Sequence, residues 1–143
     1  MIDRLTHEDD IAAIYRTPFS YVISDATYPE TGLPHPRVYG TCVHVLERFV
    51  KERGSLSLSQ AVRKMTRMPA DRYGLTKKGR VEPGADADLL IFDPERVHER
   101  ATYADPTQTC EGIETVLVGG GIAVQNGVCT GKRNGTVLER RSL

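Results

Sequence analysis

The sequence has no excess of charge of either sign and no long hydrophobic run. Its 19 lysine and arginine residues balance its 19 aspartate and glutamate residues, so no net field attracts nucleic acid or an anionic membrane. No apolar run approaches the roughly 20 residues that span a bilayer. The first ten residues, MIDRLTHEDD, also lack the apolar stretch of a secretory signal. We therefore expect a cytoplasmic protein with neither nucleic-acid nor membrane partners.

Paired cysteines of the kind that form disulfide frameworks or zinc knuckles are also missing. Cys42, Cys110 and Cys129 are odd in number and widely spaced, and no C-x-x-C motif occurs. Cys42 and His44 form a C-V-H sequence that is a possible ligand pair. A small buried thiol at the start of a helix is the commoner use of such a cysteine, and we favour that interpretation.

What is present is the composition of one globular domain of 143 residues, 39% of them apolar and 27% charged. Thr6 is a candidate N-cap for a short helix that ends before Thr17-Pro18, since a residue before proline avoids the helical conformation. Aromatic and β-branched residues then predict a strand over Phe19–Ser24. Residues 26–37 hold three prolines and a glycine, which indicates a loop.

Helical spacing follows the loop, and strand patterns follow the helices. We predict helices from Val43 to Gly54, after a capping box of Ser57 and Gln60, and from Pro69 to Gly74. Strands are predicted at 88–93, 113–118, 122–124 and 136–140, with a hairpin turn at Asn126-Gly127. The change near residues 80–84 suggests two structural units, 1–80 and 81–143. The first contains a single strand, which cannot form a sheet alone.

The order of these pieces resembles the C-terminal portion of the metal-dependent amidohydrolases, and among them the N-acyl-D-amino-acid deacylases, or D-aminoacylases. The resemblance covers nearly the whole chain. Its general superfamily mark is the Pro-Gly-x-x-Ala-Asp-Leu pattern, whereas the HPR and TYxDP patterns indicate the deacylase branch. The matching segments are SDA at 24–26, HPRVYGT at 35–41, LSLSQAVRKMTRMPADRYGL at 56–75, GRVEPGADADLLIFDP at 79–94, ATYADPTQ at 101–108 and VLVGGGIAVQNG at 116–127.

The resemblance implies an α/β fold, the C-terminal fragment of a (β/α)8 barrel together with part of a small β-sandwich-type domain. Phe19–Ser24 would be the last barrel strand, with Asp25 at its C-terminal end, where barrels place catalytic groups. By resemblance, Asp25 exchanges protons with a zinc-bound water and the leaving amine. Arg37 would bind the substrate carboxylate, because its planar fork suits that group, and His35 would line the same mouth.

The sequence does not contain the rest of such a metal site. A catalytic zinc usually takes three protein ligands, of which Asp25 is one at most. The histidines, none of them in an H-x-H pair, are His7, His35, His44 and His98. We therefore expect zinc in the parent family but none bound by this chain alone. The residue types by themselves also permit a plainer interpretation, in which Asp25 caps a turn.

Three functional hypotheses remain open. In the first, the chain is a segment of a zinc-dependent hydrolase of N-acyl-D-amino acids and is inactive alone. In the second, it is a non-enzymatic module that self-associates or binds a complementary chain through an exposed face of Val43, Leu46, Phe49 and Val50. In the third, it belongs to a cyclic-amide hydrolase. Three groups are predicted to be structural only: Asp86, Asp88 and, as a solvated bend, Lys77-Lys78.

Overall fold

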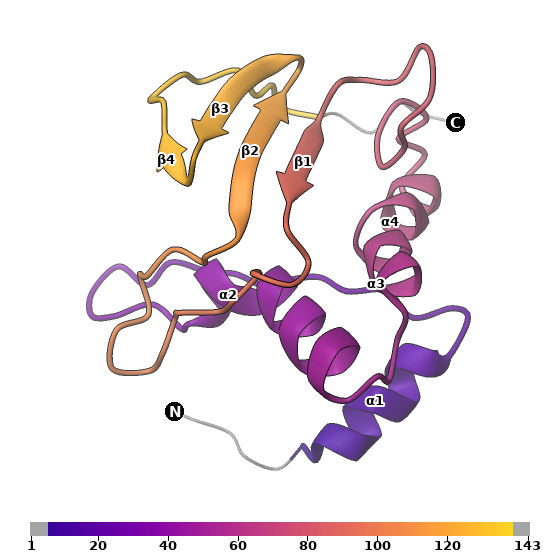
Figure 1. The fold of residues 1–143 in the computed structure, drawn as a ribbon, viewed down its shortest axis with the longest axis vertical. Coiled ribbons are helices and arrows are strands. Elements are labelled where there is room, and N and C mark those ends of the chain that lie inside the picture. Colours follow the sequence, from indigo (N-terminus) through magenta and orange to yellow (C-terminus); the bar gives the residue numbers. More distant parts are fainter. Residues whose placement is uncertain (1–5, 139–143) are drawn as a thin grey trace.

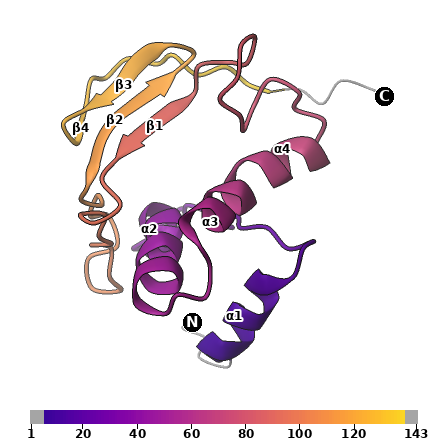
Figure 2. The same cartoon turned by 45° about the vertical axis from the view of Figure 1, so that its right-hand side comes forward.

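Helices occupy the first half of the chain and strands the second (Figure 1). The structure, a computed structural model, describes residues 6–138. The four-stranded sheet lies at one end of the molecule and the first helix at the other in both views (Figures 1 and 2). The elements are α1 (Glu8–Arg16), α2 (Arg37–His44), the π-helical η1 (Val45–Glu52), α3 (Leu58–Met65), α4 (Arg67–Arg72), β1 (Leu89–Phe92), β2 (Ile113–Val118), β3 (Gly121–Gln125) and β4 (Val128–Cys129).

Helix α1 begins one residue later than a Thr6 cap would allow, so that prediction is wrong. His7 has the extended backbone of an N-cap, and its Nδ1 accepts a hydrogen bond from the Asp9 amide at 3.3 Å. Acidic residues fill the first turn, where the positive end of the helix dipole favours them. The helix ends at Arg16, before Thr17-Pro18, as predicted.

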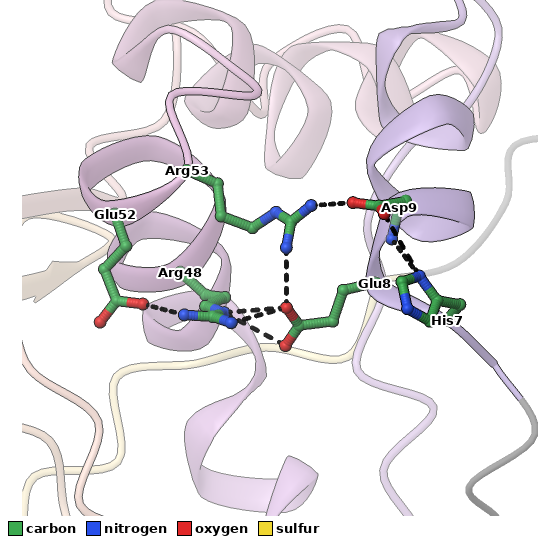
Figure 3. Close-up of polar contacts among 6 residues, drawn as sticks. All are labelled: His7, Glu8, Asp9, Arg48, Glu52 and Arg53. Atoms are coloured by element: carbon green, nitrogen blue, oxygen red, sulfur yellow. Dashed lines mark hydrogen bonds and ion pairs between the residues drawn. The ribbon is translucent and has the colours of Figure 1, made fainter.

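A charged network attaches α1 to η1 (Figure 3). Arg48 binds the Glu8 carboxylate at 2.7 Å and the Glu52 carboxylate at 2.5 Å. Arg53 lies 3.0 Å from Glu8 and also contacts Asp9. All five side chains are partly exposed, so the network specifies the placement of α1 more than it adds stability.

Two helices start earlier than predicted, and for the same reason. Helix α2 begins at Arg37 instead of Val43, because Pro36 already has helical dihedral angles and precedes the first turn. Helix α4 begins at Arg67 instead of Pro69, since the Ala70 amide donates to the Thr66 carbonyl. A proline tolerates the first turn because its missing amide hydrogen has no partner there.

The remaining helix boundaries agree with the sequence. Gly54 follows the C-cap of η1 with φ at +56°, the left-handed conformation that glycine adopts readily. Within η1 the hydrogen bonds span five residues at its end, as the bond from the Arg53 amide to the Arg48 carbonyl shows. The Ser57 and Gln60 capping box is fully formed at the start of α3.

The predicted strand over Phe19–Ser24 does not form. This segment has no regular secondary structure, and its hydrogen bonds to the helices include one from the Val22 amide to the Lys64 carbonyl at 3.1 Å. A strand needs a neighbouring strand for its backbone groups. Within residues 6–138 no strand pairs with this segment, since all four strands pair with one another in the sheet β1-β2-β3-β4.

The sheet is an antiparallel meander in the order β1-β2-β3-β4. Leu90 pairs with Val116, which in turn pairs with Val124. Asn126 and Gly127 both have positive φ, as the tight turn between β3 and β4 requires, so the predicted hairpin is confirmed. The strand predicted at 136–140 is absent at residues 136–138, and residues 139–140 lie outside the described part.

The core lies among the helices, and the second half of the chain contributes to it. Val97, which follows β1, is 1% exposed and packs with the helical residues. The buried cluster consists of Val22, Val43, Val45, Leu46, Leu56, Ala61 and Val97. The prediction of an exposed face at Val43, Leu46, Phe49 and Val50 is therefore wrong: three of these residues are buried, and Val50 packs against the cluster.

None of the helices within residues 6–138 combines the length and the apolar character needed to cross a bilayer.

Candidate functional site

Asp25 and Arg37, to which the resemblance gives separate roles, lie together. The Arg37 Nη1 atom is 3.2 Å from the Asp25 Oδ2 atom, and Arg37 opens α2. Asp25 has a φ of +48°, a left-handed conformation that is uncommon outside glycine. Such conformations cost on the order of 1–3 kcal/mol and cluster at functional sites. The carboxylate faces a guanidinium group 12 residues along the chain, so the turn-capping interpretation does not describe its contacts.

His35 is held between a backbone amide and a tyrosine hydroxyl. The Arg37 amide donates to His35 Nδ1 at 3.1 Å, so Nδ1 carries no proton and the ring proton resides on Nε2. Nε2 lies 3.2 Å from the Tyr103 hydroxyl and donates to its oxygen, with the two rings edge to face at 5.1 Å. Burial, and then the charge of Arg37, lower the pKa of His35. His35 is therefore a neutral, fixed ring, and the Tyr103 proton is free for another acceptor.

A pocket of about 490 Å³ lies beside these residues, between the start of α2 and the segment 99–103. His35 and Arg37 line one side of it, and Tyr103 and Glu99 line the other. The segment around Tyr103 is one of those that carry the resemblance, but no role was predicted for Tyr103 or Glu99. The aromatic residue in TYxDP was the available signal for Tyr103.

Two crossed histidine–glutamate pairs hold this segment on the helices. His44 Nδ1 lies 2.7 Å from the Glu99 carboxylate, and His98 Nδ1 lies 2.6 Å from that of Glu47. The Glu99 amide also donates to Glu47 at 2.8 Å. The bond to Glu99 raises the pKa of His44. Although burial opposes the change, the bonds from the Glu99 amide and His98 lower the pKa of Glu47.

Gly40 allows the Glu99 side chain to lie close to α2 and to reach His44. It is buried on α2, and a Cβ atom at this position would lie 2.0 Å from the Glu99 Oε1 atom. Any larger residue would push Glu99 away from His44. This glycine, which precedes the helix predicted from Val43, thus has a packing role that its place in the sequence alone did not reveal.

The described residues do not fit a zinc site by themselves. Within residues 6–138, no three histidine, cysteine, aspartate or glutamate side chains converge. Asp25 faces a cation, and His44 Nδ1 is engaged by Glu99. Cys42 is exposed, so the prediction of a buried thiol is wrong.

Asp86 and Asp88 form an ion-pair cluster with Lys78, so their charges are already compensated. The Lys78 ammonium lies 3.1 Å from Asp86 and 2.5 Å from Asp88. Asp88 also accepts a hydrogen bond from the Gly119 amide at 2.7 Å. The structural interpretation of the two aspartates agrees with these contacts. The prediction of a merely solvated Lys78 is wrong, because its side chain is 22% exposed and ion-paired.

Comparison with known proteins identifies the class. Residues 3–124 match the amidohydrolase family, and the chain belongs to that family. Within it, the chain is 42% identical to the N-acyl-D-aspartate deacylase of Alcaligenes xylosoxydans xylosoxydans, over 94% of this chain and 27% of that enzyme. The resemblance to the D-aminoacylase group is thereby confirmed.

Solved structures give the same result. A crystal structure of D-aminoacylase superposes with a TM-score of 0.83 at 36% identity, covering 89% of this chain and 27% of the other. An N-acyl-D-glutamate deacylase from Bordetella bronchiseptica gives 0.78 at 41% identity, covering 82% and 25%. That enzyme was solved with zinc and a phosphonate inhibitor that mimics the tetrahedral reaction intermediate. The present chain spans about a quarter of the length of these relatives.

Proposed function

We propose that the chain supplies part of the active site of an enzyme that hydrolyses the amide bond of N-acyl-D-amino acids. The observation that carries the proposal is that His35 and Arg37 line one pocket and that Asp25 forms an ion pair with Arg37. These residues come from two sides of a loop of more than ten residues. The similarity to deacylases of N-acyl-D-aspartate and N-acyl-D-glutamate supports this substrate class.

Each of the three residues has a distinct role in the proposed reaction. Asp25 takes a proton from the attacking water as general base and returns it to the leaving amine as general acid. Arg37 binds the substrate carboxylate, and its contact with Asp25 supports this role because a carboxylate bound there would lie next to the acid–base group. His35, neutral and fixed, shapes the pocket wall.

The proposed enzyme needs groups outside residues 6–138. A zinc ion in such an enzyme lowers the pKa of its bound water, and its ligands would come from elsewhere in the active enzyme. We propose that Phe19–Ser24 becomes a barrel strand only where a neighbouring strand is supplied. The boundary between the units 1–80 and 81–143, the cytoplasmic location and the lack of nucleic-acid and membrane partners stay predictions.

The inactivity of this chain alone can be tested directly. We expect the purified chain, equilibrated with zinc and freed of excess metal, to retain close to no zinc by elemental analysis. We also expect it to release no amine from N-acetyl-D-aspartate or N-acetyl-D-glutamate. Stoichiometric zinc together with turnover would show that the chain builds its own site, and the dependence on outside groups would be wrong.

The roles of the site residues can be tested in an active enzyme. We would use a chimaera in which this chain replaces the matching quarter of the Alcaligenes N-acyl-D-aspartate deacylase. Asp25→Asn should lower kcat by about 10²–10⁴-fold, because the general base is lost. Asp10→Asn is the matched control, since Asp10 is an exposed aspartate on α1. An active chimaera with an unimpaired Asp25→Asn variant would contradict the role of Asp25.

The alternative of a non-enzymatic module has lost its main support, because the face it relied on is buried. Self-association stays a prediction, and sedimentation velocity tests it: a clean monomer counts against it. No contact within residues 6–138 favours the cyclic-amide alternative. The guanidinium group of the HPR loop suits a substrate that has a free carboxylate.

A further inference from the structure

Lys64 on α3 is a charged side chain buried in the core, with 6% of its surface exposed. Its ammonium group donates three hydrogen bonds: to the Thr17 carbonyl at 2.7 Å, to the Ser20 carbonyl at 2.8 Å and to the Ser20 hydroxyl at 3.1 Å. No carboxylate takes part in these contacts. A lysine has three donors, so the group is fully satisfied by one short segment of the chain.

The same residue also holds that segment through its backbone. The Val22 amide donates to the Lys64 carbonyl at 3.1 Å, and the Val22 side chain is buried in the core cluster. Residues 17–22 are thus fixed at three places by a single residue of α3. The ammonium group also lies at the C-terminal end of α1, where a positive charge is favoured.

The anchored segment leads directly to Asp25. Asp25 itself is exposed, with 74% of its side chain accessible and one ion pair to Arg37. Its own contacts are too few to determine where it lies. Its backbone is nonetheless in a defined left-handed conformation, and its place depends on the residues before it.

We propose that Lys64 is a positioning residue for Asp25: it fixes residues 17–22 through its ammonium and carbonyl groups and so places the Asp25 carboxylate against Arg37, which lines the pocket. This inference rests on the proposed function, because it assigns Lys64 to the placement of the acid–base group. Lys64 does not touch the substrate or the reacting atoms. Its effect on Asp25 is indirect, because Asp25 follows the anchored Val22 by three residues.

The first test uses the chain as it stands and requires no activity. Lys64→Met removes the three donors and leaves the Thr17 and Ser20 carbonyls without their partner. We expect amide hydrogen exchange at Val22 to accelerate at least about tenfold. We also expect the amide resonances of Asp25 and Arg37 to shift. Arg63→Met is the matched control, because Arg63 is the exposed neighbour on α3 and undergoes a similar loss of charge.

Ser20→Ala provides a milder variant in case Lys64→Met does not fold. It removes the hydroxyl that accepts from Lys64 and donates to the Ile14 carbonyl at 2.7 Å, and it should produce the same pattern of changes at smaller size. Lys64→Arg, which keeps a charged donor, should restore much of the protection at Val22. Unchanged exchange and resonances in Lys64→Met, as in Arg63→Met, would overturn the proposal.

The second test uses the chimaera described above and keeps the two proposals separate. Lys64→Met should lower kcat, corrected for folded fraction, by at least about tenfold while KM stays within twofold, and Lys64→Arg should recover part of the loss. A fall in folded fraction alone, with kcat per folded molecule unchanged, would overturn the positioning role. An inactive parent chimaera would instead count against the proposed function and leave the exchange measurements to decide on Lys64.

Discussion

The helical half and the sheet of this protein are built by different means. In the helical half, Phe49 and Val45 are each 1% exposed, and Ala61 is fully buried. In the sheet, Leu90 and Ile91 are about half exposed, and every residue of β1–β4 retains some accessible surface. The helices therefore depend on a shared core, whereas the sheet depends on the hydrogen bonds of its meander.

The contrast also explains which strands form. Each strand of the meander finds its partner within residues 89–129, so its ladder closes within the chain. Phe19–Ser24 has equally good strand residues but no partner of this kind, and Phe19 and Ile23 stay 78% and 66% exposed. Strand propensity is thus expressed only where a second strand is available.

The strongest test of the contrast compares a core residue with a sheet residue. Phe49→Ala should lower the free energy of unfolding by about 3–5 kcal/mol, because it removes a fully buried ring that packs edge to face on Tyr15 at 5.0 Å. Leu90→Ala should cost less than about 1 kcal/mol, since the side chain is 50% exposed. Urea unfolding followed by circular dichroism gives both values. Similar losses at the two positions would contradict the contrast.

Local signals were predictable from the sequence because their chemistry lies within a few residues. The Ser57 capping box, the glycine end of η1 at Gly54 and the Asn126-Gly127 turn each need only their own dihedral angles and near neighbours. Helix starts were less predictable, since Pro36 and Thr66 determine them through backbone geometry that side-chain periodicity does not report.

The site was predictable only in part, because some of its contacts join residues that are far apart in the sequence. Asp25, His35 and Arg37 lie in one short stretch, residues 25–37, so two neighbouring motifs, SDA and HPRVYGT, indicated them. Tyr103 reaches His35 across 68 residues, and Glu99 reaches His44 across 55. Such contacts follow from the packing of the 98–103 segment on α2, and no periodicity in either segment encodes the pairing.

A smaller change in stability tests how much a local signal, the Ser57 cap, contributes to the stability of the helical half. Ser57→Ala should destabilise the chain by about 1 kcal/mol, because the hydroxyl that accepts from the Gln60 amide at 3.2 Å is lost. Ser59→Ala, an exposed position in the same helix, should be neutral or slightly stabilising, since alanine favours helix. Thermal unfolding of the two variants side by side measures the difference. Equal shifts would mean that the cap adds nothing beyond helix propensity.

The smallest effect concerns the junction between the two halves, where His44 binds Glu99 and Glu47 binds His98. The raised pKa of His44 stabilises the folded state fully below about pH 6.5, and this contribution is lost as the pH rises through the folded value. The lowered pKa of Glu47 has the opposite sign, so its contribution is present above about pH 4.5 and is lost as the pH falls. The junction should therefore be most stable between these two limits.

Glu99→Gln isolates the histidine part of this dependence. We expect it to cost less than about 1 kcal/mol near pH 6, since the His44 side chain is 47% exposed, and to cost progressively less as the pH rises further. Glu114→Gln makes the same chemical change at an exposed position of β2 and should show no such trend. Unfolding free energies of both variants between pH 5 and pH 8.5 decide the matter. A cost for Glu99→Gln that does not vary with pH would show that the carboxylate acts on the Gly40 contact and the packing of α2, and not on the charge of His44.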